Sequence, residues 1–130
     1  RDSVFIGHQQ VQEHPEWRFS LSNTTGFAAA VLGPSSTTVG VDIENKNRGV
    51  GEGIAKRMRH PDDASELSAL ELWCIKEAAY KTLGAEIQSK IWLNSIAVSQ
   101  TKFSVAGVFG DWQHVPHSGL VVILAKLTSN

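Results

Sequence analysis

Hydrophobic and polar residues alternate in the first third of the chain in the manner of short antiparallel strands. Residues 18–22 alternate, residues 23–26 (Asn-Thr-Thr-Gly) have turn chemistry, and residues 27–32 form an apolar run. Residues 33–36 (Gly-Pro-Ser-Ser) supply a second turn, and residues 39–44 alternate with a period of two. The pattern predicts a hairpin that is followed closely by a third strand.

The middle of the chain has the residue spacing of helices. Residues 52–59 form a short candidate helix, and Pro61-Asp62-Asp63 supplies start signals for a long helix that ends at Gly84. Apolar residues recur in the long helix at intervals of three or four positions, and we expect them to face a sheet. These residues are Leu72, Ile75, Ala79 and Leu83.

Strand patterns return after the long helix, with candidates at residues 96–98, 103–105 and 120–127. Strands, then helices, then strands predict an α+β fold in which helices pack on one face of a mainly antiparallel sheet. The sequence contains no internal repeat and no long polar linker. We therefore expect residues 1–130 to form a single domain.

The composition of the 130-residue chain narrows the range of functions. Twelve Lys and Arg residues against 13 Asp and Glu residues leave a net charge of -1, which disfavours a protein that coats nucleic acid. No apolar run approaches the roughly 20 residues that span a bilayer. The single cysteine, Cys74, cannot form an internal disulfide. We expect a cytoplasmic protein that binds neither nucleic acid nor membranes.

Two acidic residues lie within the alternating segment at residues 39–44. Because successive strand residues point to opposite faces, Asp42 and Glu44 share one face, with Cα atoms about 6.6 Å apart. Two carboxylates this close repel each other unless a cation lies between them, and hard oxygen ligands suit Mg²⁺. For an arbitrary pair of this kind a solvated sheet edge is the commoner explanation, so the pair alone decides nothing.

A second set of polar residues lies on the predicted long helix. Trp73, Glu77 and Lys81 are spaced four residues apart and form one stripe, and Glu77 is rotated about 200° from the core residue Ile75. An exposed Glu–Lys pair beside an ordinarily packed Trp73 explains part of this pattern, and Lys76 is equally a candidate for a solvated surface residue. A large tryptophan on the charged stripe nevertheless indicates a partly enclosed site.

Together, these two segments resemble the signatures of the 4′-phosphopantetheinyl transferases. The family has a G-[IV]-D-x-E strand and, some thirty residues later, a W-x-x-K-E-[AS]-x-x-K helix. Here the segments are Gly40-Val41-Asp42-Ile43-Glu44 and Trp73-Cys74-Ile75-Lys76-Glu77-Ala78-Ala79-Tyr80-Lys81. Residues 19–22 and 27–31 are similar to the family's S-[IL]-S-H hairpin, and residues 54–58 are similar to its first helix. The resemblance covers residues 17–84.

The resemblance implies an enzyme with a phosphopantetheinyl-transferase-like lobe. Such an enzyme moves 4′-phosphopantetheine from coenzyme A to a serine of an acyl- or peptidyl-carrier protein. Asp42, Glu44 and Glu77 are implied to hold Mg²⁺, and three carboxylates suit a hard cation. Lys81 is implied to contact the phosphate under attack, and Glu77 is the implied general base. The implied coenzyme A-binding residues are Ser22, Asn23, Lys76 and Lys81.

Two features depart from the family pattern. The order of the motifs is similar to that in the larger, two-lobed members of the surfactin-synthetase-activating type. However, 130 residues are too few for two full lobes. Residues 1–35 resemble the remnant of an N-terminal lobe. Asn23 stands where the family usually has histidine, and asparagine carries no positive charge. The alternative function is a non-catalytic transferase-like domain that binds a carrier protein or a partner subunit.

A lone lobe would leave one wall of the coenzyme A cleft open, and a site for so large a ligand usually has enclosing walls. We therefore expect an active chain to self-associate. Closed symmetric homo-oligomers are the common solution, and a dimer is favoured over a trimer.

Overall fold

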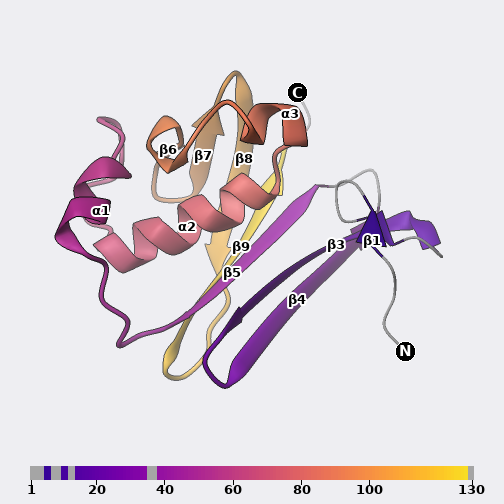
Figure 1. The fold of residues 1–130 in the computed structure, drawn as a ribbon, viewed down its shortest axis with the longest axis horizontal. Helices are drawn as coiled ribbons and strands as arrows, with labels where there is room; N and C mark the ends of the chain where they lie inside the picture. The colour runs from indigo at the N-terminus through magenta and orange to yellow at the C-terminus, as the bar shows by residue number, and fades with distance from the viewer. Residues whose placement is uncertain (1–4, 7–9, 12–13, 35–37, 129–130) are drawn as a thin grey trace.

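The computed structural model describes residues 5–6, 10–11, 14–34 and 38–128, which form two antiparallel sheets with helices (Figure 1). The first sheet has the strand order β1-β2-β3-β4, and the second has the order β5-β9-β8-β7-β6. The strands are β1 (Phe5–Ile6), β2 (Gln10–Val11), β3 (His14–Thr24), β4 (Phe27–Pro34), β5 (Val39–Asn45), β6 (Ala97–Val98), β7 (Lys102–Val105), β8 (Val108–His114) and β9 (Leu120–Leu127). The helices are α1 (Glu52–Arg57), α2 (Ala69–Lys81) and α3 (Ala85–Gln88), and Leu93–Ser95 forms a 3₁₀ turn.

Helix α2 covers one face of the five-stranded sheet, as Figure 1 shows. The four apolar residues that the sequence assigns to the inner face of the predicted helix are all buried in the main core, although α2 ends at Lys81 and Leu83 follows it. Residues of β7, β8 and β9 such as Val105, Trp112 and Ile123 belong to the same core. The predicted α+β class, with a mainly antiparallel sheet and helices on one of its faces, is confirmed. No helix in the described part of the chain is long and apolar enough to cross a membrane.

The start of α2 differs from the prediction. The helix begins at Ala69, and Pro61-Asp62-Asp63 lies in a turn that precedes it. Ser68 caps the helix: its Oγ accepts the Glu71 amide at 3.1 Å, and the Glu71 carboxylate accepts the Ser68 amide at 3.0 Å. This reciprocal pair satisfies two amides that the first turn of any helix leaves unpaired.

The predicted hairpin and third strand are present, but they belong to different sheets. Strands β3 and β4 meet at a turn in which Gly26 has a φ of +82°, a value that favours glycine. The amides of β5 that face β3 bond to side chains: the Val41 amide donates to Ser20 Oγ and the Ile43 amide to Ser22 Oγ, each at 3.1 Å. Two serine hydroxyls therefore replace a backbone ladder and satisfy buried amides.

The hairpin packs against the face of β5 that points away from α2. Ala29 and Val31 of β4 contact a small apolar cluster formed by β5 and the start of β9. The buried members of this cluster are Val41, Ile43, Leu120 and Val122. Strand β5 is thus held between the hairpin on one side and α2 on the other.

The sequence pattern did not predict β8, which pairs with β7 and β9 in the middle of the second sheet. A tight turn at Ala106 (φ +51°) and Gly107 (φ +76°) joins β7 to β8. Within β8, Gly110 lies opposite Phe103, and a Cβ at Gly110 would come within 2.3 Å of the Phe103 ring. A glycine therefore interrupts the alternation of a buried strand because an aromatic ring takes the space of its side chain.

Gly40 allows β5 to approach α2 unusually closely. A Cβ at this position would lie 2.1 Å from the carbonyl oxygen of Ala78 and 3.1 Å from Cβ of Lys81. The first of these neighbours is helix backbone, which cannot rotate away. The close approach brings the acidic end of β5 against the charged stripe of α2.

Replacing Gly40 with alanine should therefore separate β5 from α2. We expect urea denaturation to show a loss of about 3 kcal/mol in the free energy of unfolding. This value is at the upper end of the usual cost of overpacking a core. The matched control is Gly49→Ala, because nothing lies within 4 Å of a Cβ at Gly49. Its effect should stay within about 0.5 kcal/mol, and equal effects of the two variants would contradict the close approach.

Candidate active site

The ammonium of Lys81 brings the two motif segments together. Lys81 Nζ, at the end of α2, donates to the Val41 carbonyl at 2.9 Å and lies 3.4 Å from Asp42 Oδ1, both in β5. The same ammonium donates to the Leu21 carbonyl of β3 at 3.2 Å. The Lys81 side chain is 23% exposed, so its charge remains accessible from solvent.

Asp42 is the most enclosed carboxylate of this region. The residue is 5% exposed, and Ser22 Oγ donates to its Oδ1 at 3.2 Å. Its Oδ2 is buried and has no hydrogen-bond partner within the described residues. Burial raises the pKa of Asp42, and the nearby Lys81 ammonium opposes this shift only in part. The buried Oδ2 is thus an acceptor without a donor, which costs free energy unless a cation or donor reaches it.

Glu77 lies on α2 near Asp42. Burial raises the pKa of Glu77, and the negative charge of Asp42 raises it further, while Lys81 and Arg48 act in the opposite direction. Within the described part of the chain, no hydrogen bond or ion pair engages Glu77. This carboxyl group is therefore held in a half-buried position with its acceptor atoms uncommitted.

Glu44 is engaged by Arg48, a residue that lies outside both family motifs. Arg48 forms an ion pair with the Glu44 carboxylate, and its guanidinium lies 5.2 Å from the centre of the Trp73 ring. Thr24 Oγ1 donates to the other oxygen of Glu44 at 3.5 Å. The sequence signal for this pair is the spacing of Glu44 and Arg48, which are four residues apart.

The three expected metal ligands are neighbours, but their carboxylates do not meet. Asp42, Glu44 and Glu77 influence one another's charge, since both Asp42 and Glu44 raise the pKa of Glu77. Among the residues that the structure describes, no three His, Cys, Asp or Glu side chains lie close enough together to hold a metal ion. Glu44 is instead paired with Arg48 of the loop that follows β5.

Cys74 lies between the acidic strand and the core. Its thiol is buried, and burial raises its pKa, with a further increase from the charges of Asp42 and Glu44. A thiol in such surroundings stays protonated at neutral pH and is a poor nucleophile. Cys74 therefore packs in the core beside Asp42, with which its thiol interacts, and is not a candidate nucleophile.

Ser22 and Asn23 lie on opposite faces of β3. The Ser22 hydroxyl points toward β5, where it bonds to Asp42 and to the Ile43 amide. Asn23 is exposed, because the next residue of a strand points to the other face. The two residues therefore do not share one binding surface, and in this structure Ser22 acts on the carboxylate of Asp42.

Lys76 lies buried away from the candidate site in this structure, although the family resemblance implies that it binds coenzyme A. Its side chain is 0% exposed, and its Nζ donates to the Met58 carbonyl at 2.6 Å and pairs with Asp63 Oδ2 at 2.8 Å. Burial lowers the pKa of Lys76. Asp63 also accepts the amides of His60 and Val98. Lys76 thus anchors the turn before α2 and is not a solvated surface residue.

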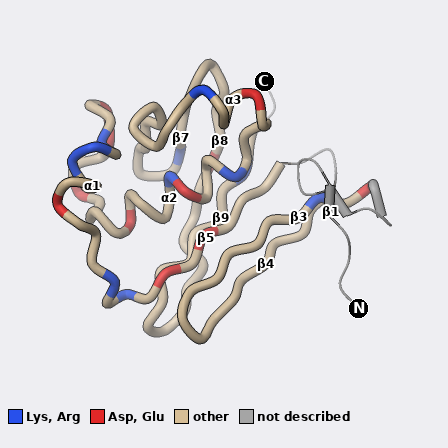
Figure 2. The backbone as a smooth tube through the Cα atoms, in the orientation of Figure 1, with Lys and Arg blue, Asp and Glu red and all other residues tan. Residues whose placement is uncertain are grey.

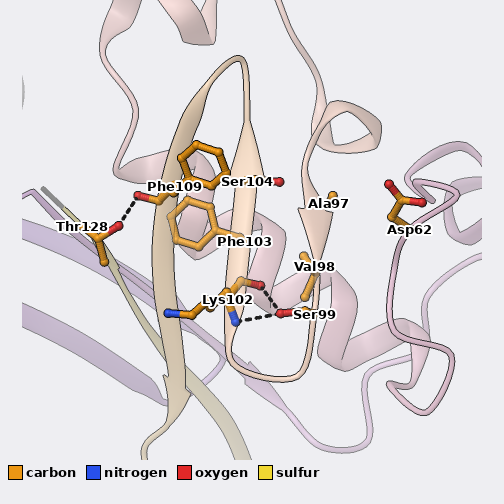
Figure 3. A pocket seen from close by; sticks show the side chains of 9 residues that line it. All are labelled: Asp62, Ala97, Val98, Ser99, Lys102, Phe103, Ser104, Phe109 and Thr128. Carbon is orange, nitrogen blue, oxygen red and sulfur yellow. Dashed lines mark hydrogen bonds between the residues drawn. The ribbon is translucent and has the colours of Figure 1, made fainter. Parts of the chain in front are cut away.

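Two hollows help to delimit the site. One of about 290 Å³ lies beside β6 and β7 and includes Phe103, Phe109 and Lys102 in its lining (Figure 3). None of the candidate catalytic, metal-binding or coenzyme-binding residues lines it. The other, of about 550 Å³, lies beside Glu44 and is polar. It is lined by Thr24, Thr25, Glu44, Asn45, Asn47, Arg48 and Gly119.

Comparison with protein families identifies a family for this chain. Residues 38–119 match the family model described as the 4′-phosphopantetheinyl transferase superfamily. The matched range includes β5, α2 and the loop that contains Arg48. A search of curated proteins found no match.

Proposed function

Because the chain belongs to the 4′-phosphopantetheinyl transferase superfamily, we propose that it transfers 4′-phosphopantetheine from coenzyme A to a serine of an acyl- or peptidyl-carrier protein in a reaction that depends on Mg²⁺. Family membership supports phosphopantetheine transfer in general. The observation that carries the specific proposal is the meeting of Lys81 with Asp42, because it places the acidic strand beside the stripe of α2 that contains Glu77.

The uncommitted carboxyl group of Glu77 suits the general base. In the proposed reaction the serine oxygen of the carrier attacks the phosphorus that bears the pantetheine arm, and the bond from this phosphorus to the oxygen of the adenosine bisphosphate breaks. Glu77, directly or through a water, takes the serine proton. A raised pKa brings a carboxyl group closer to the working pH of a base. Lys81 offsets negative charge that develops on the phosphate.

The residues present suit a hard divalent cation. Asp42 Oδ2 is a buried acceptor without a partner, and Asp42 and Glu77 carry charges that disfavour each other. Carboxylate oxygens are the usual protein ligands of Mg²⁺. Asp42, Glu44 and Glu77 would hold the cation, which when bound would neutralise the pyrophosphate oxygens of coenzyme A.

The direct test is incubation of the chain with coenzyme A, Mg²⁺ and an apo carrier protein, followed by mass spectrometry of the carrier. We expect a gain of one phosphopantetheine group. Asp42→Asn keeps the shape of the side chain and should weaken Mg²⁺-dependent coenzyme A binding by at least about tenfold in calorimetry. The control is Asp111→Asn, which changes an exposed aspartate on β8 that pairs with Lys102.

Two results would contradict this function. A folded chain that leaves every tested carrier unmodified favours the alternative, a non-catalytic domain that binds a carrier protein or a partner subunit. Unchanged Mg²⁺-dependent coenzyme A affinity in Asp42→Asn would exclude Asp42 from the metal site.

A basic surface on α1 suits the acidic carrier proteins. Figure 2 shows one group of basic residues on α1 and another in the loop after β5. Lys56, Arg57 and Arg59 are exposed at the end of α1. In the loop, the guanidinium of Arg48 is already engaged by Glu44. The α1 group is therefore the better candidate for attracting an acidic partner.

Reversing the charge of this surface with Lys56→Glu and Arg59→Glu should slow carrier association about tenfold at low salt, because steering by exposed charges acts mainly on the association rate. Stopped-flow measurements at increasing salt provide the check, since screening should remove the difference. The paired control is Lys90→Glu with Lys126→Glu, two exposed lysines away from α1. Equal slowing by both pairs would indicate a net-charge effect without a specific surface.

We also expect the active form to be a homo-oligomer, with a dimer favoured over a trimer. The outer face of the β3–β4 hairpin supports this, because Leu21 and Leu32 are 49% and 58% exposed there, and Ala28 and Ala30 are exposed on the same face. Light scattering at micromolar concentration, with and without coenzyme A and Mg²⁺, measures the state. A monomer that transfers phosphopantetheine at full rate would contradict the expectation.

A further inference from the structure

Arg48 connects two residues of the candidate site. Its guanidinium pairs with the Glu44 carboxylate and lies over the Trp73 ring at 5.2 Å from the ring centre. A planar guanidinium can stack on an indole and donate to a carboxylate at the same time. Trp73, one turn before Glu77 on α2, therefore supports Arg48 at Glu44.

The charges of the site make Arg48 a counter-ion of the carboxylate group. Asp42, Glu44 and Glu77 carry three negative charges when ionised, and Lys81 supplies one positive charge. Arg48 supplies a second, and its proximity lowers the pKa of Glu77 against the larger effect of burial. Arg48 therefore provides at Glu44 the positive charge that a metal ion would provide when bound to the same carboxylate.

Arg48 is also placed so that it can leave. Its side chain is 43% exposed, whereas that of Glu44 is 13% exposed. It lines the polar hollow of about 550 Å³, whose other lining groups include Asn45, Asn47 and Thr24. A displaced guanidinium would enter solvent or this hollow without crossing packed protein. Exposed ion pairs and cation–π contacts are individually weak, so a divalent cation can displace this one.

We propose that, in the metal-free enzyme, the Arg48 guanidinium pairs with the Glu44 carboxylate at the position that the metal would occupy. Metal binding then releases the guanidinium, which binds a phosphate group of coenzyme A. This role rests on the proposed function, because it takes Glu44 as a metal ligand and coenzyme A as the substrate. A guanidinium suits phosphate because it donates two parallel hydrogen bonds to neighbouring oxygens. Arg48 would thus oppose metal binding and favour coenzyme A binding.

Calorimetry on the full chain separates these two effects. With Mg²⁺ alone, Arg48→Gln should bind the metal about fivefold more tightly than the wild type, because one competing cation is gone. With coenzyme A at saturating Mg²⁺, the same variant should bind about tenfold more weakly, because a charge-assisted phosphate contact is lost. Opposite changes in one variant are not expected from misfolding. The control is Lys126→Gln, an exposed lysine on β9 that loses the same charge.

A second background tests whether the effect passes through Glu44. In a Glu44→Gln chain, adding Arg48→Gln should no longer tighten Mg²⁺ binding, because the shared carboxylate is gone. If Arg48→Gln still tightens Mg²⁺ binding in this background, or does not tighten it in the wild-type background, Arg48 does not compete with the metal at Glu44. Unchanged coenzyme A affinity in Arg48→Gln would overturn the phosphate role.

The same titrations distinguish failure of this role from failure of the proposed function. If the wild-type chain requires Mg²⁺ to bind coenzyme A and Arg48→Gln changes neither affinity, only the role of Arg48 is wrong. If the wild-type chain binds no Mg²⁺ either alone or with coenzyme A, the metal-dependent function is wrong and the role of Arg48 falls with it.

Discussion

The candidate site depends on one ammonium group that holds three segments together. Lys81 extends from α2 and donates to a carbonyl of β3 and a carbonyl of β5, and it lies beside the Asp42 carboxylate. These carbonyls are available because β3 and β5 form no backbone ladder, and serine hydroxyls take the opposing amides. In a continuous sheet the same groups would bond to each other. The break between the two sheets thus supplies polar backbone at the position where the acidic residues lie.

Much of this arrangement follows from local sequence rules. The period of two in residues 39–44 places Asp42 on the face opposite Val41 and Ile43, and the structure shows this division, with the two apolar residues in the hairpin cluster. The helical period places the apolar residues of α2 in the core and leaves Glu77 and Lys81 toward β5. The two motifs were recognised from their resemblance to the family signatures, whereas the faces that their residues occupy follow from the periods of strand and helix. Their meeting depends on Gly40, whose missing side chain is visible in the sequence although the close contact is not.

Other features depend on contacts between distant residues. Lys76 lies within the family motif, but its burial results from Asp63 and the Met58 carbonyl, which the turn before α2 brings over the helix. Strand β8 was missed because Gly110 lies under Phe103, a pairing that only the sheet register shows. The start of α2 was misplaced for a different reason, since the capping box of Ser68 and Glu71 is a local signal that outweighs the earlier turn residues. Arg48 acquires its role only when Trp73 of α2 lies beneath it.

The charges of the site also explain why it should respond to cations. Burial raises the pKa of both Asp42 and Glu77, so the folded state binds protons more tightly than the unfolded state at these groups. Their contribution to stability therefore falls as the pH rises from the usual carboxyl range through the raised values. Lys81 opposes this loss for both groups, and Arg48 opposes it for Glu77. These two side chains are too few to satisfy every acceptor, because Asp42 Oδ2 is left without a partner among the described residues. When a fold buries more carboxylate oxygens than its own positive side chains can pair with, any further cation that binds these oxygens stabilises the fold. At neutral pH, the divalent ion of the proposed function would supply the positive charge that these carboxylates lack.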